Sequence, residues 1–355
     1  EIRPRDWSSD VCSSDLFYMS NLFKKAAVFT DLHLGYKQNS QLFLNDCDRY
    51  MDWFLNLVKS ENCDTVLFLG DFHDTRNSLN INTMDHSLRI LERLNDIGLR
   101  VLFIPGNHDL YHKDRRTVTS IRYIEKFKNI ELVMDQHTEG DVTFVPWLIG
   151  EEHKNMRKIK SRYVMGHFEL PQFMMNAMVE MPDHGGLNSE DFGNVGTVFT
   201  GHFHKRQRKG NVHYIGNAFP HNYADAWDDD RGAMVLEWGV EPVYHNWNDG
   251  PRYRILTLSQ LLDAPETHLS DKTYARVNID INISYEEATF IKEEMAKTYA
   301  VRDLSLIQHR GEVLTENAIG DVKFESVDQI VLSQIQNLDT QHYDTRLLME
   351  IYTSL

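Results

Sequence analysis

Asp, Asn and His residues recur in five short motifs along the first 204 residues of the chain. The motifs are Asp31-Leu-His33, Gly70-Asp71, Gly106-Asn107-His108-Asp109, Gly166-His167 and Gly201-His202-Phe-His204. Their carboxylate, amide and imidazole groups suit Mn, Fe, Zn or Mg ions, and no motif offers a thiolate. A carboxylate that bridges two such ions, with imidazoles and an amide oxygen in the outer positions, makes a site that activates water and stabilises an in-line phosphoryl displacement. The motifs therefore predict a two-metal site that hydrolyses phosphoesters.

Each motif is expected where a β-strand ends. Successive motifs lie between 35 and 59 residues apart, as βαβ units produce, and the carboxyl ends of their strands converge on one crevice. Strand-length runs near 26–30, 65–69 and 100–104 alternate with amphipathic runs at 41–59, 83–96 and 117–127, which predict helices. Further strands of a second sheet, packed on the first, are predicted at 142–147, 162–165, 197–200, 212–215 and 233–238. The fold class is therefore α/β.

The pattern changes after about residue 270. Over 276–283 apolar and polar residues alternate strictly, which is typical of a half-buried strand. Ser284 and Glu287 have the spacing of a capping box that opens a helix, and another strand is expected near 301–308. This part of the chain predicts a small β-α-β cap, followed by two helices within 326–355.

The composition limits the compartment and the partners. With 37 Lys and Arg against 53 Asp and Glu among 355 residues, the formal net charge is −16. This balance counts against a protein that coats nucleic acid or an anionic membrane, although it leaves room for a locally basic groove. No apolar run approaches the roughly 20 residues of a membrane helix. Three cysteines without a C-x-x-C pair argue against a disulfide framework, so the cytoplasm is the expected compartment and no membrane partner is expected.

The first residues are set apart from the rest. Residues 6–16 read like a translated sequencing adapter rather than like a domain or a signal peptide. Residues 1–18 are therefore expected to be a non-native, disordered leader, with Met19 as the start. At the other end of the motif-bearing region, a stretch with Gly and Pro at 248–251 indicates the approach to a domain boundary.

Taken in order, the five motifs resemble the signature of the calcineurin-like metallophosphoesterases, D-x-H, G-D, G-N-H-[DE], G-H and G-H-x-H. The resemblance implies two packed mixed β-sheets flanked by helices. It implies one ion on Asp31, His33, Asp71 and His204, and a second ion on Asp71, Asn107, His167 and His202. It also implies that His108 binds the phosphate and donates a proton, and that Asp109 holds the tautomer of His108.

Within this family the chain is similar to the nuclease subunit of the SbcCD-type double-strand-break repair complex, especially that of tailed phages. The similarity rests on Gly166-His-Phe-Glu169, Gly201-His-Phe-His204, Tyr214-Ile-Gly-Asn-Ala218 with Asp230-Arg231-Gly232 after it, and the cap with its terminal helices. It implies a nuclease domain at 19–255, a DNA-binding cap at 270–311 and a helical partner-binding segment at 324–355.

The candidate substrate-binding residues come from basic clusters and from one position at which this chain differs from many cellular relatives. Basic residues follow the third and the fifth motif directly, where contacts with DNA phosphates are favoured and a solvated face is the alternative. Many cellular relatives carry a histidine three residues after the bridging aspartate, but this chain has Asp74 there and His73 before it, so Arg76 is the candidate replacement. His213 and His221, downstream of the last motif, could approach the substrate. The candidate substrate-binding residues are Asp74, Arg76, Arg115, Arg116, Lys205, Arg206 and Arg208.

The resemblance implies a DNA nuclease that depends on two Mn²⁺ ions, with Mg²⁺ or Fe²⁺ as alternatives. It implies 3′-to-5′ exonuclease action on duplex ends and endonuclease action on single strands. An ABC-type coiled-coil ATPase is the implied partner, with a homodimer inside a heterotetramer in the cytoplasm of a bacterial host. The competing hypotheses are a small-substrate metallophosphoesterase, such as a cyclic-nucleotide phosphodiesterase or protein phosphatase, and a non-catalytic scaffold. The residues after 270 favour the nuclease, because a minimal phosphatase needs neither a cap nor terminal helices.

Overall fold

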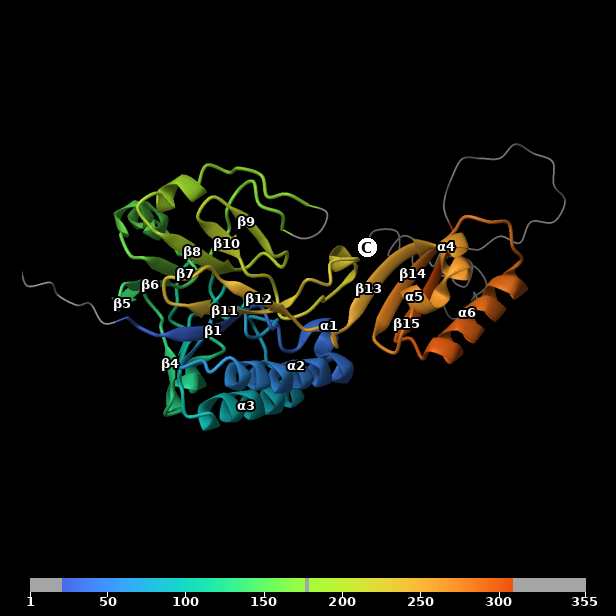
Figure 1. Cartoon of the computed structure of the whole chain (residues 1–355), viewed down its shortest axis with the longest axis horizontal. Coiled ribbons are helices and arrows are strands. Elements are labelled where there is room, and N and C mark those ends of the chain that lie inside the picture. The colour runs from blue at the N-terminus through green and yellow to red at the C-terminus, as the bar shows by residue number, and fades with distance from the viewer. Residues whose placement is uncertain (1–20, 176–178, 309–355) are drawn as a thin grey trace, which may run out of the picture. The chain divides into compact units, whose positions relative to one another are not determined.

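The computed structural model describes residues 21–175 and 179–308 (Figure 1). The described residues divide into two compact units, which meet in the sequence between Tyr253 and Arg254. The expected leader at 1–18 and the expected helical segment at 324–355 lie outside the described residues, as do residues 309–311 of the expected cap.

The first unit contains two six-stranded mixed sheets, as expected. The first sheet has the order β12-β11-β1-β2-β3-β4, in which β1 to β4 run parallel and β11 and β12 are antiparallel additions. Helices α2 (Gln41–Ser60) and α3 (Ile81–Asp96) link its first three strands, and a short α1 (Tyr36–Asn39) precedes α2. The strands are β1 (Lys25–Phe29), β2 (Thr65–Phe68), β3 (Arg100–Phe103), β4 (Ile130–Leu132), β11 (Gly232–Glu237) and β12 (Val243–Asn246).

The second sheet has the order β5-β6-β7-β8-β10-β9. Its four inner strands are parallel, and β5 and β9 pair antiparallel at the two edges. The strands are β5 (His137–Glu139), β6 (Val142–Val145), β7 (Tyr163–His167), β8 (Thr197–Gly201), β9 (Gln207–Lys209) and β10 (Val212–Tyr214). Short 3₁₀-helices accompany this unit: η1 (Arg122–Lys126), η2 (Glu152–Lys158), η3 (Ser189–Phe192) and η4 (Tyr223–Asp225).

Alternate residues of each central strand face different layers. In β1, Ala27 and Phe29 pack in the core beneath α2 and α3, whereas Ala26 and Val28 pack in the core between the two sheets. Side chains alternate along a strand, so a strand covered on both faces buries all of them, and these four are fully buried. α2 contributes an apolar stripe with the spacing of an amphipathic helix. The strand ends that carry the motifs are therefore held by apolar layers on both faces.

The second unit has a three-stranded sheet of order β13-β14-β15. Its strands are β13 (Arg252–Thr257), β14 (Thr273–Ile279) and β15 (Asp303–Gln308), and its helices are α4 (Leu258–Asp263), α5 (Pro265–His268) and α6 (Tyr285–Tyr299). β14 and β15 are parallel and α6 connects them, so the expected β-α-β arrangement is present. The expected capping box also forms, because Glu287 N–H donates to Ser284 Oγ at 3.2 Å and Ser284 N–H donates to Glu287 Oε2 at 2.8 Å. The assignment of this unit to DNA binding stays a prediction.

The expected helix at 117–127 is wrong, because only the five-residue η1 forms there. The preceding residues instead bind the third motif: Ser120 N–H donates to the carbonyl oxygen of Asp109 at 2.9 Å, and Thr119 Oγ1 donates to the same oxygen at 2.7 Å. Backbone groups that hold the Asp109 turn cannot also take part in a helix. Within the described ranges, every helix is too short or too polar to cross a lipid bilayer.

Removal of the Phe29 ring tests the core beneath α2. The ring centroid of Phe29 lies 4.5 Å from that of Phe54 and 4.7 Å from that of Phe68. Phe29→Ala is expected to lower the free energy of unfolding by about 3–5 kcal/mol, because it leaves a cavity. Ile81→Ala is the control, since Ile81 is 88% exposed, and a change within about 0.5 kcal/mol is expected. Urea unfolding followed by tryptophan fluorescence measures both, and an equal loss in the two variants would contradict the packing described.

Candidate metal centre

The five motifs meet at the carboxyl ends of strands from both sheets. Asp31, Asp71 and Asn107 follow β1, β2 and β3, while His167 ends β7 and His202 follows β8. Contacts join the two sheets at this edge: His202 N–H donates to the Asp31 carboxylate at 3.1 Å, and His167 Nδ1 donates to the carbonyl oxygen of Leu69 at 2.6 Å. The structure thus brings together the motif residues that the sequence placed at separate strand ends.

Four motif residues have left-handed backbone conformations. The φ angles are 52° for Asp31, 50° for His33, 60° for Asp71 and 88° for His202. A residue with a Cβ atom is unfavourable in this region, and such conformations persist only where surrounding contacts impose them. Their concentration in one place indicates a functional site.

Two glycines let the motif loops approach each other. Gly70 has a φ of 99°, and a Cβ atom there would lie 2.5 Å from His167 Nδ1. A Cβ atom on Gly106 would lie 2.2 Å from Asp71 Oδ1. Any larger residue would therefore displace the side chains at the centre.

One group of donors surrounds the Asn107 amide. Its oxygen lies 3.1 Å from His167 Nε2 and 2.9 Å from His202 Nδ1, and His167 Nε2 lies 3.3 Å from Asp71 Oδ2. Turned with its nitrogen inward, the amide would donate to all three and would accept from Arg76 Nη2 at 3.0 Å. Turned with its oxygen inward, it completes a cage of lone pairs that a cation satisfies.

A second group of donors lies on the other side of Asp71. His33 Nε2 lies 3.7 Å from Asp71 Oδ2, 3.8 Å from Asp31 Oδ1 and 3.3 Å from His204 Nε2. Ligands about 2.1 Å from a common ion lie roughly 3.0–3.4 Å apart, so both groups have nearly the spacing of a coordination shell. Asp71 belongs to both groups, which is the position of a bridging ligand.

The charge of the cluster favours a cation. Burial opposes the charged form of His33, but hydrogen bonds with Asp31 and Asp74 outweigh it and raise the pKa of His33 to about 10. Burial also opposes charge on His167, but the nearby Asp71 carboxylate raises the pKa of His167 to about 9. The buried carboxylates therefore bind positive charge strongly, as a divalent-ion site requires.

Outer contacts orient the imidazoles. Because Leu69 offers only a carbonyl oxygen to His167 Nδ1, Nδ1 carries a hydrogen, and Nε2 is the nitrogen that faces the centre and would bind an ion. Glu169 Oε2 lies 3.3 Å from His202 Nε2, and Asp74 Oδ1 lies 3.7 Å from His33 Nδ1. Carboxylates in these positions orient metal-binding histidines and raise their basicity.

The expectation that Asp109 holds the tautomer of His108 is wrong. His108 Nδ1 donates to the backbone carbonyl of Asp74 at 2.5 Å. The Asp109 carboxylate instead accepts four backbone N–H groups at 2.9–3.2 Å, those of Asp71, Phe72, His73 and Gly106. Asp109 is therefore a positioning residue for the loops after β2 and β3.

Two of the expected substrate-binding arginines are occupied by the protein itself. Arg116 is 9% exposed, donates to Glu152 Oε1 at 2.8 Å and to the carbonyl oxygen of Trp147 at 2.6 Å. Arg206 donates to Asn246 Oδ1 at 2.6 Å, and its guanidinium carbon lies 4.7 Å from the ring centroid of Tyr244. Both expectations are corrected, because these groups form internal contacts in place of a phosphate contact.

The remaining candidates lie at or near the surface. Arg115 is exposed and approaches His112, and Arg208 is exposed and pairs with Glu241 at 3.2 Å. Arg76 and Lys205 are partly exposed, and Arg76 lies next to the Asn107 amide.

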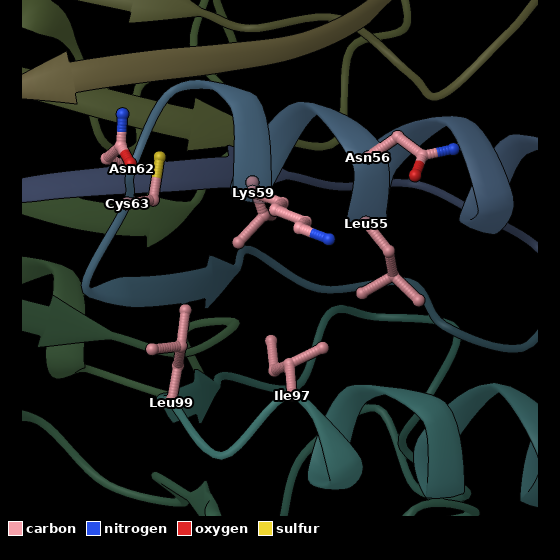
Figure 2. Close-up of a pocket in the computed structure, with 8 residues that line it drawn as sticks. Leu55, Asn56, Lys59, Asn62, Cys63, Ile97 and Leu99 are labelled. Carbon is pink, nitrogen blue, oxygen red and sulfur yellow. The ribbon is translucent and has the colours of Figure 1, made fainter.

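Two hollows in the first unit differ in what they can bind. One of about 220 Å³ reaches His202 and His204 and is also lined by Met175, Phe203, Asn222, Ala224 and Asp225. Another, of about 560 Å³, lies where α2 and α3 end and contains none of the motif residues (Figure 2). Its lining residues are Leu55, Asn56, Val58, Lys59, Asn62, Cys63, Ile97 and Leu99. The first of these hollows is the one that gives access to the candidate centre.

Sequence reasoning missed Glu169 as a site residue and left His221 open. Glu169 follows His167 by two positions, and its carboxylate was not assigned a role. His221 is buried, and its ring nitrogen forms a group with those of His33 and His204 in which all three lie within 4.8 Å of one another. No motif spacing indicated this, because the chain returns to the centre only after β10.

A family model described as calcineurin-like phosphoesterase matches residues 24–206, which is just over half of the chain. The chain belongs to this family, so the expected fold and the expected class, a metal-dependent phosphoesterase, are confirmed. The family implies divalent metal ions, and the donor groups described above fit them.

Two named proteins are similar to the chain. It is 27% identical over 221 residues to exonuclease subunit 1 of Enterobacteria phage T4, which covers 59% of this chain and 64% of the phage protein. It is 37% identical over 83 residues to the DNA double-strand break repair protein Mre11 of Saccharolobus solfataricus, which covers 22% of this chain and 21% of that protein. The chain therefore matches less than two thirds of either relative. The resemblance to nucleases of the SbcCD type is confirmed by these similarities.

Among solved structures, a dimetal phosphatase from Danio rerio shares 12% identity and a TM-score of 0.39, covering 62% of this chain and 95% of that one. A phosphoesterase from E. coli shares 14% identity and a TM-score of 0.34, covering 63% of this chain and 94% of that one. Scores this low add nothing to the assignment.

The neighbouring residues Arg115 and Arg116 form a matched pair, which tests which of the two arginines stabilises the fold. Arg116→Ala is expected to lower the free energy of unfolding by about 2–4 kcal/mol, because it leaves Glu152 and the Trp147 carbonyl without their partner. Arg115→Ala is expected to stay within about 0.5 kcal/mol of the unmodified chain. Urea unfolding of both variants measures the difference. A stable Arg116→Ala protein would return Arg116 to the candidate substrate contacts.

Proposed function

We propose that this chain is a metal-dependent DNA nuclease that hydrolyses phosphodiester bonds with two divalent ions. The observation that carries the proposal is the pair of donor groups that share Asp71 at the carboxyl edge of both sheets. Membership of the phosphoesterase family supports the reaction class, and the similarity to a phage exonuclease subunit supports DNA as the substrate.

Seven side chains would hold the ions. One ion would bind Asp31, His33, Asp71 and His204, and the other would bind Asp71, Asn107, His167 and His202. Ions bound there would activate a water molecule and neutralise charge on the phosphate oxygens. Mn²⁺ is the proposed metal, and Mg²⁺ or Fe²⁺ are the alternatives, because mixed imidazole and oxygen ligands accept each of them.

The chain's own residues position the substrate and move the proton. His108 N–H donates to Asp71 Oδ1 at 2.8 Å, which keeps His108 beside the centre. Because Nδ1 of His108 is held by the Asp74 carbonyl, Nε2 is the nitrogen that can protonate the leaving oxygen. Arg76, beside Asn107, and the surface residues Arg115, Lys205 and Arg208 are the proposed phosphate contacts, which position a polyanion without reading its sequence.

The finer functional assignments rest on the resemblance and are proposed with it. They are 3′-to-5′ exonuclease action on duplex ends, endonuclease action on single strands, and a role in recombination, repair or DNA degradation. The cap at 270–311 would bind DNA, and the segment at 324–355 would bind an ABC-type coiled-coil ATPase. The assembly would be a homodimer within a heterotetramer in the cytoplasm of a bacterial host.

Asp71→Asn tests the shared ligand. Loss of the charge is expected to weaken the binding of both ions and to abolish hydrolysis. The fold is expected to be retained, because the amide keeps the volume of the carboxyl group. Ions per chain are counted after dialysis against Mn²⁺, with Asp64→Asn as the control, since the Asp64 carboxylate accepts hydrogen bonds from Lys24 N–H and from Thr65 Oγ1. Two ions retained per chain in Asp71→Asn would contradict the bridging role.

His108→Ala separates chemistry from metal binding. Digestion of end-labelled duplex DNA with Mn²⁺ is expected to slow by about 10²–10⁴-fold, the usual contribution of a general acid, while the metal content stays normal. His112→Ala is the control, because His112 lies four residues away and contacts Arg115 and Tyr111. If DNA is untouched by the unmodified chain while a small chromogenic phosphodiester is hydrolysed, the small-substrate hypothesis replaces the nuclease.

A further inference from the structure

His221 is a buried histidine whose ring nitrogens both lack a partner. Its side chain is 1% exposed, and among the described residues neither Nδ1 nor Nε2 has a hydrogen-bond partner. The loop that carries it is fixed, because His221 N–H donates to Asp225 Oδ2 at 2.9 Å. The rings of Tyr36, Phe43 and Phe219 pack around it with centroid distances of 5.2–5.5 Å.

Other buried histidines of the described chain are paired. His73 lies 2.9 Å from Ser120 Oγ and 3.0 Å from Ser87 Oγ, and His86 lies 2.8 Å from Asp48 Oδ2. His213 keeps one contact, at 3.1 Å from Tyr244 Oη. A buried polar group without a partner lowers stability, and an apolar side chain would fit the aromatic surroundings of His221 better. The imidazole at this position therefore indicates that His221 binds a group other than a protein side chain.

The position of His221 indicates that the bound group is a metal ion. Its ring centroid lies 5.4 Å from that of His33 and 5.1 Å from that of His204. Ligand nitrogens of the three residues lie within 4.8 Å of one another. Ligands about 2.1–2.3 Å from one ion lie roughly 3.0 Å apart when adjacent and up to about 4.6 Å apart when opposite, and His33 Nε2 and His204 Nε2 lie 3.3 Å apart. The three imidazoles are therefore close to the spacing at which they can share an ion.

We propose that His221 is an eighth metal-binding residue, which ligates the ion held by Asp31, His33 and His204. This inference rests on the metal centre proposed above, and it does not depend on DNA being the substrate. The ion then has three imidazoles, whereas the ion on Asn107, His167 and His202 has two. Imidazole suits Fe and Zn better than Mg, so the two positions differ in selectivity, and His221 makes its own position the less favourable one for Mg²⁺.

Metal titration of the full-length chain tests the proposal with Mn²⁺ and Co²⁺ as probes. His221→Leu removes the ligand, and His221→Phe serves as a second variant that keeps an aromatic ring against Phe43 and Phe219. His213→Leu is the matched control, because His213 is also buried, at 2% exposure, and has one nitrogen without a partner. Calorimetry gives the affinity and number of ions, and the visible absorption of Co²⁺ gives the coordination.

The unmodified chain and His213→Leu are expected to bind two ions. The His221 variants are expected to bind one ion normally and the other about 10–100-fold more weakly, as loss of a supporting group at a metal site does, with a changed Co²⁺ spectrum. Two ions with unchanged affinity and spectrum in a folded His221 variant would overturn this inference alone. No ion in the unmodified chain would overturn both this inference and the proposed metal centre.

Discussion

The position of Asp71 depends on the carboxylate of Asp109. That carboxylate accepts the N–H groups of Asp71, Phe72 and His73 from one loop and of Gly106 from the other. A buried carboxylate that lost these donors would be left unsatisfied, so the two loops are held at a fixed separation. The left-handed conformation of Asp71 is maintained by the same contacts, and Gly106 leaves the space into which the Asp71 side chain fits. Asp71, the ligand that both donor groups share, is thus positioned by Asp109, whose own carboxylate is bound by backbone N–H groups.

The buried charge at this edge explains why the centre and the fold are coupled. Asp31, Asp71 and Asp109 are all buried and lie on loops of one sheet. Four N–H groups compensate Asp109, whereas Asp31 and Asp71 face imidazoles whose pKa values rise in response, to about 10 for His33. A cation that binds the folded chain and not the unfolded one adds stability by mass action. The affinity for a cation and the stability of the fold therefore depend on the same carboxylates.

The strands and the motif residues could be predicted from the sequence because both are local signals. Apolar runs indicated β1, β2 and β3, and polar residues directly after them had to meet at one edge of a parallel sheet. The helix expected at 117–127 failed because Thr119 and Ser120 bind the Asp109 carbonyl, which is a tertiary contact that periodicity does not report. Glu169 was missed, and His221 was named only as a residue that could approach the substrate, for the same reason: the role of each depends on what lies opposite it in space. Of the two, His221 reaches the centre from a loop that carries no motif.

The basic clusters show that closeness in the sequence does not establish which basic side chains are available to contact a phosphate. Arg115 and Arg116 are neighbours, yet Arg116 is held by Glu152 and Arg115 is exposed. Arg206 is likewise held by Asn246, so fewer basic groups are available at the centre than the sequence suggests. Each phosphate contact adds about 0.9 to the salt slope of binding to duplex DNA, so a few contacts give weak binding with a shallow salt dependence in a chain of net charge −16. In the proposed nuclease, contacts in addition to those of the motif loops would therefore be needed to retain a duplex.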